Sequence, residues 1–266
     1  MEFGEIFTDA LKYPISDYPK LLILGVVLLI SSVPAILAMF GFYNSTFTAV
    51  WSIISIIIGI LTTGYGLSVK RESISLNDEI PAFDWVNNII DGVKSFIVTF
   101  VYFIVPTVVV SLLGFISLGS AISTLPKSSI AAISNATTTN AVLNAIPPQT
   151  WTALGSGFSI VAVVAIILFV IFGLFETVAI CRLAKYGTFG EAFAFGEVYN
   201  DIKQIGVLKL IVFYIILACI SALISLVLGF IGLIPFVGII IVALVGQSFV
   251  LLFTNRAIGL LYSDVE

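Results

Sequence analysis

The residues of this sequence that are best placed to do chemistry are two charged side chains inside apolar stretches. Glu176 lies in "LFETVAICRL" and Arg256 lies in "LFTNRAIGLL". A charge at the centre of a bilayer costs about 2.5 to 3.5 kcal/mol on insertion scales, so each residue is a functional hypothesis. Three roles are open: Arg256 extends its head to the headgroup region, the two side chains form a structural ion pair, or they serve transport or catalysis. We expect Arg256 to face Glu176 or the inner water.

Hydroxyl and amide side chains accompany these charges at corresponding places in three apolar stretches. They are Thr62, Thr63, Thr177, Thr254 and Asn255. If the stretches are helices of one bundle, this pattern predicts that polar groups meet at one level. Serine and threonine at such depth also form hydrogen bonds between helices, which is their more ordinary use.

The sequence offers little else for catalysis. It has no histidine, and its two cysteines, Cys181 and Cys219, both lie in apolar runs. Its lack of histidine removes the commonest general base and the commonest metal ligand. The glycines of "GTFGEAFAFG" do not follow a strand and form no dinucleotide loop. We therefore expect no enzyme, no catalytic residue, no metal site and no cofactor. The scattered basic residues also argue against nucleic-acid binding.

Composition places these residues in a membrane. The chain is 60% hydrophobic and 10% charged, with a mean hydropathy of +1.20. A soluble domain carries about 25% charged residues, and too little polar surface exists here to cover the apolar side chains. The sequence therefore predicts an all-α integral membrane protein surrounded by lipids.

Six stretches are long enough to cross the hydrocarbon core, which takes about 20 apolar residues. The predicted spans are Leu21–Phe40, Ala49–Leu67, Ser95–Leu118, Phe158–Ile180, Leu210–Phe230 and Phe236–Leu261. We expect a single membrane domain over residues 1–266, with the largest outer loop at about 119–157.

Charge distribution predicts the orientation. Lys and Arg gather in the segments on the side of the termini, whereas Lys127 falls on the other side. Cytoplasmic loops carry this excess, so both termini of a multi-pass cell-membrane protein are predicted to be cytoplasmic. Two N-x-S/T sequons, at Asn44 and Asn135, fall in predicted outer loops and are candidate glycosylation sites.

Three similar segments of the sequence predict three repeats, with approximate boundaries 1–75, 76–187 and 188–266. Each begins with a segment holding an aspartate, Asp17, Asp91 or Asp201, just before an apolar run. In the second, Val86, Ile89, Ile90 and Val93 share one helical face, which predicts an amphipathic helix in the membrane interface. Each repeat is thus expected to be an interfacial helix followed by a transmembrane hairpin.

The stretches "DALKYPISDYPKLLILG" and "LSVKRESISLNDEIPAFDWVNNIIDGVKSFIV", together with the six-span layout, resemble an uncharacterised membrane family, domain of unknown function 4013. That family occurs largely in archaea. The resemblance rests on Tyr-Pro, Pro-x-Phe/Trp and Asp-Gly patterns around interfacial helices and covers almost the whole chain. It implies the fold and the membrane location. It implies no activity and no functional residues.

Three functions remain open from the sequence. The first is a non-enzymatic membrane scaffold, or an accessory for other membrane proteins. The second is a transporter or channel for a small or amphipathic solute, motivated by the repeats and by the polar level near Glu176. The third is a lipid-modifying enzyme, for which Glu176 would be the sole buried acid. A water-filled cavity reaching the middle of the membrane favours transport, and a solid bundle favours the scaffold.

Overall fold

A computed structural model describes residues 1–42 and 44–265, and in this part of the chain every regular element is helical. The elements are α1 (Phe3–Lys12), η1 (Tyr13–Ile15), α2 (Tyr18–Ser31), α3 (Val33–Met39), α4 (Ser45–Ile74), α5 (Trp85–Ser123), α6 (Lys127–Ser134), α7 (Thr139–Ala145), α8 (Pro148–Tyr186), η2 (Phe189–Phe193), α9 (Phe195–Ile205), α10 (Val207–Gly232), α11 (Val237–Ile241), η3 (Val242–Gly246) and α12 (Gln247–Tyr262). The predicted all-α class is confirmed.

Five helical stretches are long and apolar enough to cross a membrane. They are Ser45–Ile74, Trp85–Ser123, Pro148–Tyr186, Val207–Gly232 and Val237–Tyr262. A bent pair, Phe3–Ile15 and Tyr18–Ser31 at 79° to each other, would raise the number to six. The first predicted span corresponds to α2 and α3, which are interrupted at Ser32 just before Pro34. Proline has no N–H to donate, so it begins α3 rather than continuing α2.

The chain divides into two compact units. The first comprises residues 1–99 and 174–266, and the second comprises residues 100–173. The helices α5 and α8 each contribute to both units. The three predicted repeats do not coincide with these units, and the repeat boundaries stay a prediction.

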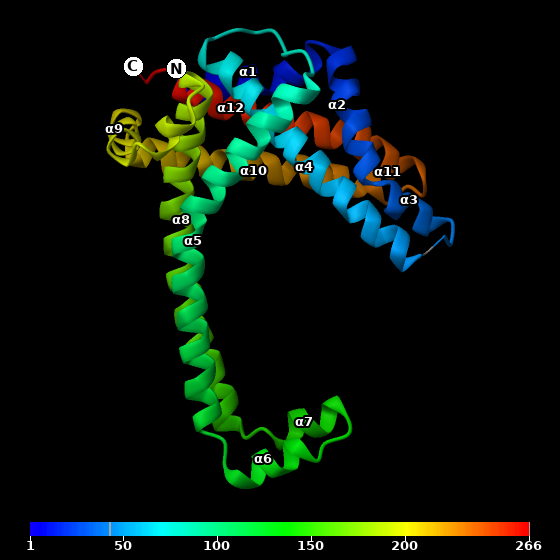
Figure 1. The fold of residues 1–266 in the computed structure, drawn as a ribbon, viewed down its shortest axis with the longest axis vertical. Helices are drawn as coiled ribbons and strands as arrows, with labels where there is room; N and C mark the ends of the chain where they lie inside the picture. The colour runs from blue at the N-terminus through cyan, green and yellow to red at the C-terminus, as the bar shows by residue number, and fades with distance from the viewer. Residues whose placement is uncertain (43, 266) are drawn as a thin grey trace. The chain divides into compact units, whose positions relative to one another are not determined.

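In the first unit, α12 is the central helix. It packs on α4, α1 and α2, and α2 also lies against the π-helical turn η3. The two ends of the chain lie beside α1 and α12 (Figure 1), where the amino group of Met1 is 2.5 Å from a carboxylate oxygen of Asp264. The core holds large buried side chains such as Tyr65, Leu252 and Phe253. This unit contains every residue that the sequence singled out for chemistry apart from the sequon residue Asn135.

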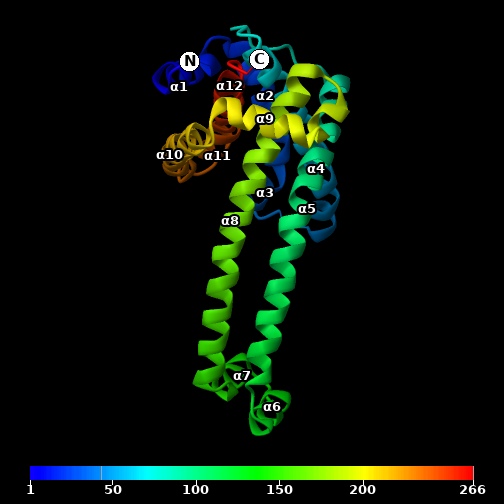
Figure 2. The same ribbon diagram turned by 90° about the vertical axis from the view of Figure 1, so that its left-hand side faces the viewer.

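The second unit is a helical hairpin. Here α5 and α8 run side by side (Figure 2), with the rings of Phe103 and Phe169 stacked at 5.7 Å. Thr124 and Thr150 share a hydrogen bond of 2.8 Å between their hydroxyls where the hairpin meets α6 and α7. The predicted outer loop, 119–157, is therefore largely helical.

The predicted interfacial helix of the second repeat is not a separate element, because α5 runs without a break from Trp85 to Ser123. In its first turns two polar residues, Asn88 and Asp91, are buried, whereas Asn87 is exposed. Asn88 is 1% exposed, whereas Val86 is 67% exposed. A soluble helix would show the reverse pattern. Apolar side chains directed outward and polar ones directed inward fit a lipid surrounding.

Candidate functional site

Arg256 is almost completely buried, at 1% exposure, yet it is fully paired. Its Nε lies 2.7 Å from a carboxylate oxygen of Asp9, and its Nη2 lies 2.5 Å from Asp78. Its Nη1 donates to the carbonyl of Asn77 at 2.6 Å, and the guanidinium lies over the ring of Tyr13. The helix α1 and the turn after α4 thus surround this cation.

Glu176 belongs to a different set of contacts. Its carboxylate accepts a hydrogen bond of 2.6 Å from the hydroxyl of Thr99. The structure does not bring Glu176 and Arg256 together, so the ion pair considered from the sequence is wrong. The reason is that α1 and the turn after α4 bring two carboxylates, Asp9 and Asp78, directly to the guanidinium.

The residues of the predicted polar level do not form one ring. Thr62 and Thr63 donate to carbonyls one turn earlier in α4, at Ile58 and Gly59. Such bonds within a helix satisfy the hydroxyl without reaching another helix. Thr177 lies half-buried on α8. Of the residues on α12, Asn255 makes a bond across helices and Thr254 lines a groove that is described below.

Lys70 is the residue that sequence reasoning missed. Its Nζ donates to Oδ1 of Asn255 at 2.6 Å, while Nδ2 of Asn255 donates to the carbonyl of Leu251. The thiol of Cys181 and the carboxylate of Glu176 lie within electrostatic range of this ammonium. Among the described residues, the one hydrogen bond that the Lys70 ammonium donates is accepted by Asn255. From the sequence, Lys70 counted only as one of the basic residues beside a loop.

Two further arginines end their helices in the same manner as Arg256. Arg71 of α4 lies 2.9 Å from Asp91. Arg182 of α8 lies 2.8 Å from Asp201, and it also pairs with Glu191. The hydroxyl of Tyr262 donates to the same Asp201 carboxylate. The sequence predicted loop charges here, whereas the structure shows specific pairs, of which Arg182–Asp201 is buried and Arg71–Asp91 is partly exposed.

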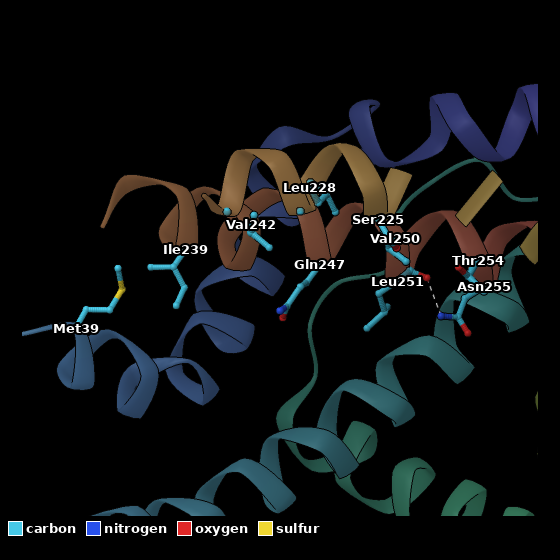
Figure 3. A pocket seen from close by; sticks show the side chains of 12 residues that line it. Met39, Ser225, Leu228, Ile239, Val242, Gln247, Val250, Leu251, Thr254 and Asn255 are labelled. Atoms are coloured by element: carbon cyan, nitrogen blue, oxygen red, sulfur yellow. Dashed lines mark hydrogen bonds between the residues drawn. The ribbon is translucent and has the colours of Figure 1, made fainter. Parts of the chain in front are cut away.

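A groove with a volume of about 740 Å³ runs along α10, η3 and α12. Figure 3 shows its side chains, with Met39 at one end and Asn255 at the other. Most lining residues are apolar. The polar ones are Ser225, Gln247, Thr254 and Asn255. Thr254 and Asn255 follow Gln247 by seven and eight residues, so the three lie along one face of α12.

The π-helical turn η3 borders this groove. Val242, its first residue, lines the groove. On the other side of the turn, the carbonyl of Leu244 comes so near α2 that a Cβ on Gly25 would stand 1.8 Å from its oxygen. Phe236, immediately before α11, has a positive φ of 62°. Single π-turns are rare in helices and are frequently found at functional sites.

The remaining predicted sites are exposed. Asn44 caps α4, its Oδ1 accepting from the backbone N–H of Thr46 and Phe47. Asn135 follows the last turn of α6. Their glycosylation stays a prediction. In residues 1–42 and 44–265, no group of three or more His, Cys, Asp or Glu side chains is arranged to hold a metal ion.

No curated protein and no solved structure matches the chain. A family model described as "Protein of unknown function (DUF4013)" matches residues 47–251, which is more than half of the chain. The resemblance drawn from the sequence is therefore confirmed. The matched region includes the groove residues on α10 and α12 up to Leu251. The chain belongs to the DUF4013 family of proteins of unknown function, as a member built from apolar helices that are long enough to cross a membrane.

Proposed function

We propose that the protein is a non-enzymatic, multi-pass protein of the cell membrane that holds an amphipathic lipid and acts as a scaffold or accessory for other membrane components. The groove along α10, η3 and α12 carries this proposal. Its volume of about 740 Å³ falls within the usual range for small-molecule sites, about 300 to 1,000 Å³. It is lined mainly by apolar side chains, which suit an acyl or isoprenoid chain.

The polar side chains of the groove favour a ligand with a polar end. Gln247 lies along the wall, and Thr254 and Asn255 lie together at one end. Asn255 is held by the ammonium of Lys70 at 2.6 Å. An ammonium has three donors, and one of them is used here. A ligand headgroup that presents an acceptor oxygen beside Thr254 and Asn255 would be bound there and attracted by the charge of Lys70, which contacts Asn255 but is not among the residues that line the groove.

A second candidate is transport of an amphipathic solute. The π-turn η3, which lines the groove through Val242, and the strained backbone at Phe236, immediately before α11, favour it. Helix breaks of this kind accompany substrate sites in membrane transporters. A transporter would move the lipid between leaflets, whereas a scaffold would retain it.

The groove can be tested by filling it. A Cβ added at Gly229 would meet no atom within 4 Å, so Gly229→Phe adds bulk to the groove without displacing the backbone. Val227, on the same helix, is 56% exposed and does not line the groove, so Val227→Phe is the matched control. Native mass spectrometry of protein purified in mild detergent measures the retained lipid. We expect retention to fall at least about tenfold for Gly229→Phe and to stay unchanged for Val227→Phe. Equal retention in both variants would contradict the proposal.

The headgroup contact needs its own variant. Lys70→Met keeps a long apolar side chain and removes the donors, so we expect it to weaken crosslinking to a photoreactive phosphatidic acid. A photoreactive diacylglycerol, which has a neutral head, distinguishes a charge contact from a hydrogen bond. Movement of a fluorescent phospholipid between the leaflets of proteoliposomes would support transport, and retention without movement supports the scaffold.

A further inference from the structure

Three arginine–aspartate pairs link helices of the first unit. Arg71 precedes Asp91 by 20 residues, and Arg182 precedes Asp201 by 19. In the third pair the order along the chain is reversed, and Asp9 and Arg256 are 247 residues apart. This pair is therefore related to the other two by the positions of its residues in their helices and not by spacing along the chain.

The three aspartates also hold one position in their helices. Asp9, Asp91 and Asp201 are each the seventh residue, of α1, α5 and α9 respectively. Each of these helices begins with an aromatic residue, and its fourth residue is buried: Ile6, Asn88 or Val198. Asp17, which the sequence placed in this set, caps α2 instead and pairs with Lys20 three residues later.

We infer that the three arginine–aspartate joints of the first unit are cyclically equivalent and form a closed ring. Each returning helix, α4, α8 or α12, carries near its end an arginine that binds the seventh residue of the helix opening the next repeat. The arginine of α12 binds the opening helix of the first repeat. Beside this third joint, the amino group of Met1 lies 2.5 Å from a carboxylate oxygen of Asp264. This inference does not depend on the proposed ligand.

The residues at the centre of the bundle provide independent support. The residues immediately before the three arginines are Lys70, Cys181 and Asn255. If the repeats are equivalent around an axis, these three side chains must approach each other. Lys70 does donate to Asn255 at 2.6 Å, and Cys181 lies within electrostatic range of Lys70. Four residues before each arginine, Leu67, Val178 and Leu252 are all buried.

The ring assigns a role to α1. By chain order it opens the first hairpin, but by contact it closes the third, because Asp9 binds Arg256 and α1 packs on α12. In this arrangement α5 binds the arginine of α4, and α9 binds the arginine of α8, in the way that α1 binds the arginine of α12. At two of the three joints the chain itself also connects the paired helices. At the third joint, side chains connect α12 to α1.

Coupling between the paired residues tests the ring. Asp9→Asn, Asp91→Asn and Asp201→Asn are combined with Arg256→Gln, Arg71→Gln and Arg182→Gln, and unfolding temperatures are measured in detergent. We expect each single change to lower that temperature by about 5 °C or more, with comparable coupling in all three pairs. Asp17→Asn is the control, and we expect a change below about 2 °C. Coupling in two pairs but not between Asp9 and Arg256 would overturn the closed ring.

A circular permutant tests the equivalence of the joints. Met1 and Glu266 are joined by a short Gly-Ser linker, and new ends are opened between Gly187 and Thr188, before η2. The Arg182–Asp201 pair then bridges the new ends, as Arg256 and Asp9 do in the natural chain. We expect the permutant to insert and to unfold within about 5 °C of the parent. A permutant that fails to insert would overturn the equivalence of the joints, while the coupling measurements judge the pairs separately.

Discussion

At the scale of single residues, the notable feature is a buried arginine whose partners reach solvent. Arg256 is 1% exposed, whereas the side chains of Asp9 and Asp78 are 37% and 84% exposed. A buried cation is tolerated when its donors are paired, and the planar guanidinium has enough donors for two carboxylates and a carbonyl. The aspartates keep part of their hydration, so their desolvation cost is modest. Arg256 therefore fixes α1 and the turn after α4 to α12.

This arrangement predicts unequal effects for the two charges that the sequence singled out. Arg256→Ala removes several charged hydrogen bonds, each worth about 1.5 to 3 kcal/mol, and we expect the free energy of unfolding to fall by about 2 to 4 kcal/mol. Glu176→Ala removes the single bond from Thr99, so about 1 kcal/mol is expected. Because the two residues share no partner, the double variant should be additive. Chemical denaturation in detergent measures the free energy of unfolding of the two single variants and of the double variant. Recovery of stability in the double variant would contradict the structure.

The burial of Arg256 was expected from the sequence, but its partner could not be predicted. Its distance from Asp264 along a helix predicts a position inside the apolar layer, and the structure leaves it 1% exposed within the protein. Asp9 is 247 residues away in the chain, and no local spacing connects the two. Lys70 was missed for a related reason. Its position at the end of a span indicates a loop charge, and only the packing of α4 on α12 brings it to Asn255.

At the scale of elements, the junction between α2 and the π-turn η3 depends on one glycine. A Cβ at Gly25 would stand 1.8 Å from the carbonyl oxygen of Leu244. We expect Gly25→Ala to destabilise the protein by about 1 to 3 kcal/mol, as overpacking does, and to alter the groove beside η3. Thermal unfolding and lipid retention are the measurements.

Gly59 offers the matched control for that prediction. It lies inside α4, and a Cβ there would meet no atom within 4 Å. Gly59→Ala should stabilise the helix by up to about 1 kcal/mol, because alanine has the higher helix propensity. If both substitutions had the same effect, close packing at η3 could not be the cause.

The start of α5 predicts a dependence on pH. Backbone N–H groups of Asn87 and Val86, and the side chain of Asn87, donate to Asp84 and hold the pKa of its carboxyl below the usual value. A lowered pKa in the folded state means that the stabilisation is present above the unfolded pKa, about 3.9, and is lost as the pH falls through the folded pKa. The protection of the Val86 and Asn87 amides, measured against their intrinsic exchange rates at the same pH, should therefore fall below about pH 4. Asp84→Asn, which has no titrating carboxyl, should remove this pH dependence of the protection. If that variant showed the same loss of protection, the carboxyl would not be its cause.

The sequence predicted the apolar helices well and their breaks poorly. Long charge-free stretches gave the positions of α4, α5, α8, α10 and the helices after Phe236. The amphipathic pattern at Val86–Val93 was interpreted as a separate helix in the interface, but α5 continues through it. Periodicity shows which face is apolar and cannot show whether the helix ends. The π-turn η3 was missed because no local pattern in the sequence marks it, although its packing against Gly25 is close.

At the scale of the whole molecule, the apolar side chains that the structure leaves exposed are concentrated on the long helices. Phe96, Phe100, Phe115 and Ile166 are each more than half exposed. Water would not tolerate so much contiguous apolar surface, so lipid is the natural surrounding. Both chain ends lie with the three arginine pairs in the first unit. The orientation predicted from the sequence can therefore be tested by labelling residues on the two sides of the membrane.

That test is labelling with a membrane-impermeant thiol reagent in intact cells. Cys181 is buried, but Cys219 is exposed, so both are first replaced by alanine. Single cysteines are then introduced at Ser45, Ser134 and Ser75, which are all exposed. Ser73 is unsuitable because it is fully buried and would stay unlabelled on either side. With cytoplasmic termini, Ser45→Cys and Ser134→Cys should label from outside, and Ser75→Cys should label only after the membrane is opened. Labelling of Ser75→Cys alone in intact cells would reverse the orientation, and the arginine pairs would then face the outside.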